Sequence, residues 1–193
     1  MTRKLGIVSI TLFVSILIAG LYGMLHDQIT YSISNEYFTK FKYRQFGFDP
    51  AWFGGDRQTV AIIGFLATWW FGLLIGLLIG LTAWIFPEIR AMKKAIKKGI
   101  LLVFLTVVLA GIAGYFYGRF YLAGTGVRWW LPADLEDRSH FIITGSIHNF
   151  SYAGGLLGLF IALAWMIRAR IYGSRSLDAP GDSSQRKASP FTR

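Results

Sequence analysis

Five side chains in this sequence belong to the types that bind metal ions or transfer protons. They are His26, Asp27, Glu36, His140 and His148. Imidazole nitrogens and carboxylate oxygens are ligands of divalent transition metals. Their spacing does not form a local motif such as H-E-x-x-H, so a shared site requires a fold that brings distant segments together. The sequence therefore predicts a candidate polar or ligand cluster whose metal is unknown.

His148 stands inside an apolar segment, after its polar start. At 1.5 Å per residue of helix, the imidazole lies roughly 10 Å deep. Ser151 and Tyr152 follow at helical spacing and form a polar stripe with it. An ionisable group inside a membrane is costly and marks a functional candidate, but a neutral imidazole can also hydrogen-bond a neighbouring helix. The structural and the functional interpretation of His148 both stay open.

Two kinds of ligand fit the functional interpretation. The five side chains offer nitrogen and oxygen ligands to a divalent metal, or His26 and His148 hold a b-type haem between two helices. Plainer interpretations compete with both. Asp27 can be a cap or a surface charge at the end of the first span, and Glu36 can complement a helix N-terminus.

Other kinds of chemistry are excluded or have no motif. The sequence contains no cysteine, which excludes disulfides, thiolate catalysis, iron–sulfur clusters and cysteine zinc sites. It has no glycine-rich phosphate loop, no nucleophile elbow and no Ser/His/Asp set in a plausible order. Enzymatic activity stays open, and the sequence favours a protein that is not an enzyme.

The composition indicates a bundle of membrane helices. Hydrophobic residues make up 54% of the 193 residues and charged residues only 16%, and the mean hydropathy is +0.47. Four apolar segments are long enough to span a bilayer, at residues 5–25, 60–86, 99–118 and 141–167. We predict an all-α membrane protein, a four-transmembrane up-and-down helix bundle with an interfacial aromatic outer loop.

Residues 1–173 are predicted to form one transmembrane domain. Residues 174–193 are rich in Ser, Pro, Gly and charge, and we expect a disordered cytoplasmic tail. The first apolar segment exceeds the about 7–15 residues of a signal-peptide core, so we expect a retained span, with cleavage as the lesser alternative. The sequence Pro132-Ala133-Asp134 predicts the start of the helix that leads into the fourth span.

Charge sets the predicted orientation. The net charge is +10, and a cluster of cations follows Pro87. Its members are Arg90, Lys93, Lys94, Lys97 and Lys98. The positive-inside rule places this loop and both termini in the cytoplasm, while the two other connections carry balanced charge and face outward. All three histidines then lie toward the outer leaflet, in a multi-pass protein of the bacterial inner membrane.

The outer segment at residues 26–47 reads HDQITYSISNEYFTKFKYRQFG and mixes charged with aromatic residues. Ser34, before Asn35 and Glu36, predicts a helix N-cap. The alternation of Lys40 and Lys42 with aromatic residues fits a strand instead. We favour a short interfacial helix.

This segment resembles the first extramembrane loop of a family of small bacterial four-span membrane proteins that has no assigned biochemical function. The similarity is specific in the EYFTKFK core and covers roughly a tenth to an eighth of the chain; elsewhere only the spacing of the hydrophobic segments agrees. The resemblance implies a bacterial inner membrane protein. It carries over no catalytic residues.

Gly72, Gly76 and Gly80 recur every fourth residue and predict close helix packing, inside the chain or between copies. The predicted partners are the lipid bilayer and a membrane protein or a second copy. Nucleic acid is excluded because the cations flank apolar segments.

The leading functional hypothesis is a non-enzymatic structural or partner-binding membrane protein whose outer loop packs over its own mouth or engages a partner. One alternative is a metal- or haem-binding redox or transport component. A transporter for a small solute or for protons ranks lower, because the spans lack acidic residues at the midplane.

Overall fold

Four long helices make up most of the part of the protein that the structure describes. The computed structural model describes residues 1–178, with side chains up to Tyr172. The helices are α1 (Thr2–Ile33), α3 (Asp56–Thr82), α4 (Ile89–Tyr117) and α6 (Arg138–Asp178). Each is long and apolar enough to cross a membrane, and residues 1–178 contain no strand. The predicted class, an all-α bundle of four spans, is confirmed.

Short helical turns connect or extend the long helices. They are η1 (Tyr37–Lys42), α2 (Tyr43–Phe46), η2 (Pro50–Phe53), η3 (Ala83–Ile85), η4 (Gly118–Leu122) and α5 (Ala123–Thr125). The first two form the aromatic segment after α1, so the strand alternative for residues 40–44 is wrong. The hydroxyl of Ser34 accepts a hydrogen bond from the backbone N–H of Tyr37 at 3.4 Å, as an N-cap does.

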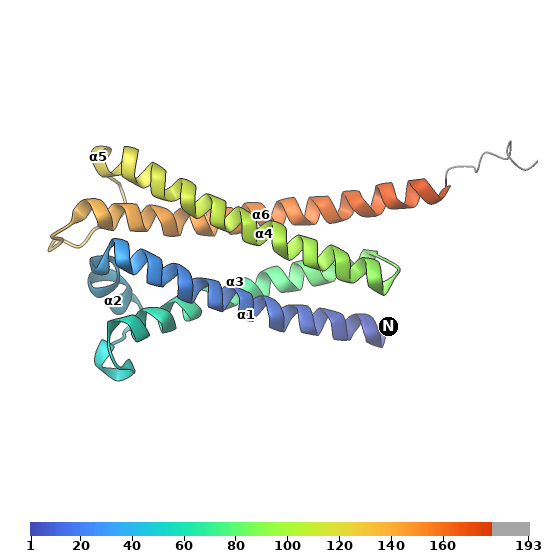
Figure 1. The fold of residues 1–193 in the computed structure, drawn as a ribbon, viewed down its shortest axis with the longest axis horizontal. Coiled ribbons are helices and arrows are strands. Elements are labelled where there is room, and N and C mark those ends of the chain that lie inside the picture. Colours follow the sequence, from blue (N-terminus) through green and yellow to red (C-terminus); the bar gives the residue numbers. More distant parts are fainter. Residues whose placement is uncertain (179–193) are drawn as a thin grey trace, which may run out of the picture.

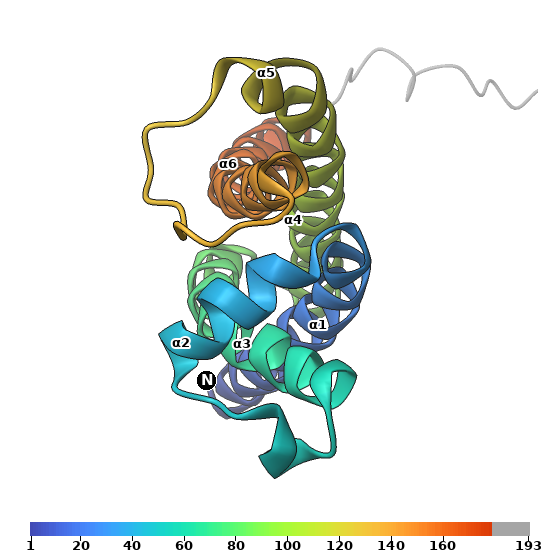
Figure 2. The same cartoon turned by 90° about the vertical axis from the view of Figure 1, so that its left-hand side faces the viewer.

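The four helices run alternately up and down and form two pairs. α1 packs mainly on α3, and α4 packs mainly on α6. Figure 1 shows the N-terminus and the α3–α4 turn at one end of the bundle, and Figure 2 shows the two pairs beside each other. We call the end with Lys4 and Lys94 the basic end, and the end with Tyr37 and Trp130 the loop end.

α1 is longer than the predicted first span. It continues past residue 25 to Ile33, so His26 and Asp27 lie inside a helix and not in a loop. The hydroxyls of Thr30 and Ser32 donate to carbonyls four residues back, which satisfies polar side chains within the helix. The helix ends at Ser34, whose backbone is extended, with φ −145° and ψ 103°.

α6 begins at Arg138, so the helix start predicted at Pro132-Ala133-Asp134 is wrong. The cap is Asp137, whose Oδ1 accepts a hydrogen bond from the backbone N–H of His140 at 3.0 Å. At its other end α6 continues to Asp178 and includes the first residues of the predicted tail. Residues 179–193, the rest of that tail, lie outside the described residues.

The cations predicted in a loop form the first turns of α4, which begins at Ile89. Only residues 86–88 connect η3 to α4, because Pro87 lacks the N–H that a continuing helix needs. The Nζ of Lys4 donates to the carbonyl oxygens of Trp84 (3.3 Å) and Phe86 (2.7 Å). These carbonyls lack helical partners, so the Lys4 cation caps the end of η3.

Glycines allow α1 and α3 to approach closely. A Cβ on Gly23 would overlap the carbonyl oxygen of Gly64, and a Cβ on Gly64 would overlap that of Gly23. Gly72, Gly76 and Gly80 also lie against α1, so the seam that they form lies inside the chain. Such contacts matter in lipid, where no hydrophobic effect drives helices together.

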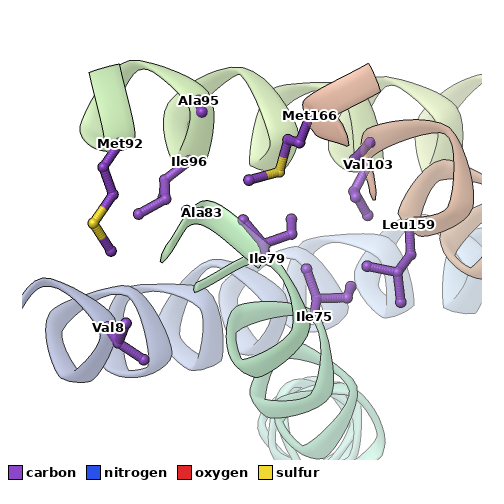
Figure 3. Packing of buried hydrophobic residues seen from close by; sticks show 11 residues of the cluster. Val8, Ile75, Ile79, Ala83, Met92, Ala95, Ile96, Val103, Leu159 and Met166 are labelled. Carbon is purple, nitrogen blue, oxygen red and sulfur yellow. The ribbon is translucent and has the colours of Figure 1, made fainter. Parts of the chain in front are cut away.

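Two buried clusters join the helices. The cluster in Figure 3 lies toward the basic end and takes side chains from all four helices, among them Val8, Ile79, Met92 and Met166. The second cluster joins η1 and α2 to α3 and α6 at the loop end, and its fully buried members are Phe38, Val60 and Ile63. Between the two clusters lies a polar site.

Candidate functional site

The fold brings three of the five predicted side chains together. His26 and Asp27 come from α1, and His148 comes from α6, and one ligand atom from each lies within 4.8 Å of the others. Asp27 Oδ1 is 3.0 Å from His26 Nδ1 and 3.8 Å from His148 Nε2. The two imidazole rings meet edge to face, with centroids 4.7 Å apart.

Asp27 is the buried acid of this site. Its residue is 3% exposed, and Oδ2 has no hydrogen-bond partner within the part of the chain that the structure describes. An unpaired buried carboxylate oxygen is costly, because it loses water and gains no donor. The site therefore has an unused hydrogen-bond acceptor.

Neighbouring hydroxyls hold both imidazoles. Ser151 Oγ lies 3.3 Å from His26 Nε2, and Thr30 Oγ1 lies 3.3 Å from His148 Nε2. Since a carboxylate only accepts, the nitrogen of His26 that faces Asp27 carries the proton, and the Ser151 hydroxyl donates to the other nitrogen. Hydrogen bonds of this kind fix the orientation of a histidine ring before a metal ion binds to it.

An aromatic lid covers the site at the loop end. The lid is η1 with α2, and the Tyr37 ring stacks on the His148 imidazole with centroids 4.8 Å apart and planes at 25°. Phe38, beside it, is fully buried. Burial raises the pKa of Tyr37, so its phenol stays neutral over the His148 ring.

Lys42 places a cation in the lid. Its residue is 7% exposed, and Nζ lies 5.5 to 5.9 Å from the ring centroids of Tyr37, Phe41 and Phe46. Burial lowers the pKa of Lys42, and the negative charge of Asp27 partly opposes that shift. The cation is held over aromatic faces, an arrangement that is favourable when the ammonium is desolvated.

Glu36 lies away from the histidines and ties the lid to the loop before α6. Its two oxygens accept from the backbone N–H groups of Glu136 (2.9 Å) and Asp137 (2.7 Å). Lys40 lies 2.5 Å from the same carboxylate. These backbone donors, together with the Lys40 cation, lower the pKa of Glu36 to about 2. The predicted cluster is therefore wrong to include Glu36.

His140 is the other predicted side chain that the fold leaves out. Its Nδ1 pairs with Asp137 Oδ2 at 2.6 Å on the surface of the loop end, with a side chain that is 47% exposed. The backbone and side chain of His140 lower the pKa of Asp137. This exposed pair caps α6 and provides a comparison for the buried histidines.

Replacing Glu36 by glutamine is expected to lower the free energy of unfolding by about 1.5–3 kcal/mol at pH 7, because a charged acceptor of two hydrogen bonds becomes neutral. Because the pKa of Glu36 is lowered in the folded protein, its carboxylate adds to the free energy of unfolding. This contribution has its full value above pH 4.5 and is lost as the pH falls through about 2. Thermal unfolding in detergent should therefore separate E36Q from the native chain clearly at pH 7 and less at pH 3.

The control for this change is Glu136→Gln, which alters an exposed carboxylate and keeps the Glu136 backbone donor. We expect its unfolding midpoint to match that of the native chain. If the midpoint of E36Q also matches that of the native chain at pH 7, the hydrogen bonds from Glu36 to the backbone before α6 do not stabilise the fold.

A cavity of about 90 Å³ extends from the three-residue site toward the middle of the bundle, between the two helix pairs. His26, Asp27 and His148 line its polar end together with Ser151 and Tyr152. The rest of the lining is largely apolar. The fold therefore places an ionisable site at the end of an apolar cavity.

The three ligand atoms fit a transition metal. Around a tetrahedral zinc with bonds of about 2.0–2.1 Å, neighbouring ligand atoms are about 3.3–3.4 Å apart, and the distances of 3.0 and 3.8 Å to Asp27 Oδ1 lie on either side of this value. Binding requires small side-chain movements and a change of tautomer, because His26 Nδ1 must give up the proton that it shares with Asp27. The other ring nitrogen, Nε2, then carries the proton and donates to the Ser151 hydroxyl. A haem between the rings of His26 and His148 does not fit, since these rings touch and leave no space for a porphyrin.

Comparisons with protein-family models, curated proteins and solved structures give no match to this chain.

Sequence reasoning missed two residues of the site and recognised a third only as polar. Thr30 and Tyr37 contact His148, and neither was a candidate. Thr30 lies four residues after His26, which on a helix is the same face, but that signal is visible only once α1 is known to continue past residue 25. Ser151 was part of the predicted stripe without a partner.

Proposed function

We propose that this chain is a multi-pass protein of the bacterial inner membrane that binds a divalent transition metal ion, of the Zn²⁺ class, through His26, Asp27 and His148. The observation that carries the proposal is the buried carboxyl group of Asp27 beside two imidazoles, with its Oδ2 unpaired. A metal ion bound by the carboxyl group and both imidazoles would offset the cost of burying this unpaired oxygen. Two nitrogens and one carboxylate are a ligand set that zinc accepts.

The aromatic lid gives this proposal a second part. Tyr37 stacks on His148, so the segment after α1 packs over the mouth of its own bundle. We propose that the lid controls exchange of the ion with the solution at the loop end, and that the protein stores or transfers metal without catalysing a reaction. The hydrogen bonds that Glu36 accepts from the backbone of Glu136 and Asp137 hold the lid in place.

The test is metal content at equilibrium. The purified full-length protein in detergent, stripped with a chelator and dialysed against Zn²⁺, is expected to hold one ion per chain. Elemental analysis gives the ratio, and Mg²⁺ in parallel controls for adsorption to carboxylates, because Mg²⁺ prefers oxygen ligands. A ratio near zero for Zn²⁺, or equal retention of Mg²⁺, would remove the proposal.

We propose further that the basic end faces the cytoplasm and the loop end faces outward. Support comes from the cations at the basic end, which include Lys93, Lys94, Lys97 and Lys98, and from the positive-inside rule. The site would then lie in the outer leaflet and take its ion from the periplasm.

Orientation is testable because the chain has no cysteine. Ala133→Cys and Lys94→Cys place single thiols at exposed positions on the loop end and the basic end. In intact cells whose outer membrane is permeabilised, an impermeant maleimide should label A133C at once and K94C only after the inner membrane is opened. The reverse pattern would contradict the proposed orientation.

A further inference from the structure

The cavity below the proposed metal site has aromatic walls that the metal does not use. Each spanning helix contributes one ring to the lining: Tyr22 from α1, Phe71 from α3, Phe104 from α4 and Tyr152 from α6. Tyr22 meets Phe104 edge to face at 6.0 Å between centroids, and Phe71 meets Tyr152 edge to face at 6.4 Å. Aromatic faces and edges of this kind pack favourably against another aromatic ring.

Asp27 lines the polar end of the cavity, and a ligand reaches its unpaired oxygen when the carboxyl group turns toward the cavity. Tyr152 already donates its hydroxyl to the carbonyl oxygen of Ala67. Asp27 Oδ2 has no donor among the residues that the structure describes. A ligand with an O–H group would supply the missing donor, and a hydrogen bond to a charged acceptor is stronger than one between neutral groups.

The cavity also reaches the lipid-facing surface. Ile18 of α1 and Phe104 of α4 line it, and they are 38% and 41% exposed on the outside of the bundle. A ligand can therefore enter sideways from the bilayer and leave an alkyl tail in the lipid. The volume of about 90 Å³ is smaller than the roughly 150 Å³ of an apolar cavity that holds benzene, so a ring fits when the exposed side chains at the lipid-facing opening move outward.

We propose that this cavity binds a lipid-soluble phenol, a hydroxylated aromatic ring with an alkyl tail. Its ring lies among the four aromatic side chains, and its hydroxyl donates to Asp27 Oδ2. The site shares Asp27 with the proposed metal site, but the binding does not require a metal ion. The ligand class goes beyond the proposed function, because a metal store alone has no use for a cavity open to lipid.

The test compares two probes that differ in one donor, 4-decylphenol and 4-decylanisole, by calorimetric titration of the chelator-treated full-length protein in detergent micelles. The phenol should bind at least about tenfold more tightly, as expected for one hydrogen bond to a charged group. In Asp27→Asn, whose amide can donate as well as accept, this preference should fall below about threefold. Equal affinity for the two probes in the native protein would overturn the proposal.

A second variant separates the cavity from the metal site. Val107 of α4 lines the cavity and is not among the metal-ligating side chains, so Val107→Phe fills the space where the ring would lie. V107F should lose binding of 4-decylphenol at least tenfold and keep the native affinity for Zn²⁺, which also shows that it folds. Unchanged phenol binding by V107F would show that the phenol does not bind in this cavity. A native protein that binds phenol but no zinc would overturn only the metal proposal.

Discussion

Replacing His148 by glutamine is expected to weaken Zn²⁺ binding by about 100-fold or more. Loss of an outer partner of a metal ligand costs about 10- to 100-fold in affinity, and His148 is a direct ligand in the proposed site. Glutamine keeps the polarity and approximate size of the side chain, so the buried position is not left empty. The dissociation constant, measured by competition with a chromophoric chelator in detergent, gives the size of the loss.

His140→Gln makes the same chemical change at an exposed imidazole that lies on the surface with Asp137. We expect it to bind Zn²⁺ as the native chain does. Asp27→Asn should behave like H148Q, because it removes the negative charge beside both imidazoles. Equal losses in H148Q and H140Q would show that zinc binds at surface histidines and would contradict the buried site.

A valine at Gly64 is expected to separate α1 from α3 and lower the free energy of unfolding by about 3 kcal/mol or more. A Cβ at Gly64 would overlap backbone atoms of Gly23, which cannot rotate away as a side chain can. Overpacking of a close contact costs about 1–3 kcal/mol and more when the backbone itself must move. Unfolding by sodium dodecyl sulfate in mixed micelles, followed by circular dichroism, measures the change.

Gly6→Val is the matched control for G64V. Gly6 lies on α1, where a Cβ would have no neighbour within 4 Å, so this change carries the same cost in helix propensity and no overlap. We expect an effect below about 1 kcal/mol. If both valines cost the same, the close approach of α1 and α3 does not hold the bundle together.

The four spans were predictable because the bilayer requires long apolar helices, which composition alone reveals. Their ends were not predictable. α1 continues through His26 and Asp27 because the fold supplies partners for these side chains, and a hydropathy pattern ends where polar residues begin. The start of α6 was predicted too early, because Pro132 and Asp134 resemble a helix start while the actual cap is Asp137.

The site was half predictable, for a similar reason. His148 stood out as an ionisable group within a span, and the prediction that all three histidines share one end of the bundle led to His26. Which carboxylate joins them depends on helix rotation and on the packing of α1 against α6. Asp27 was a candidate ligand or a cap, and it is buried in the site. Glu36 was a candidate ligand or a partner of a helix N-terminus, and it binds backbone N–H groups just before α6.

The central claim is that one metal ion is bound by two imidazoles and one carboxylate. X-ray absorption at the zinc edge, on the zinc-loaded full-length protein, tests it most directly. We predict about two imidazole nitrogens and at least one oxygen at about 2.0–2.1 Å, with the imidazole scattering reduced by half in H148Q. A zinc shell that contains only oxygens, or a spectrum that H148Q leaves unchanged, would contradict the claim.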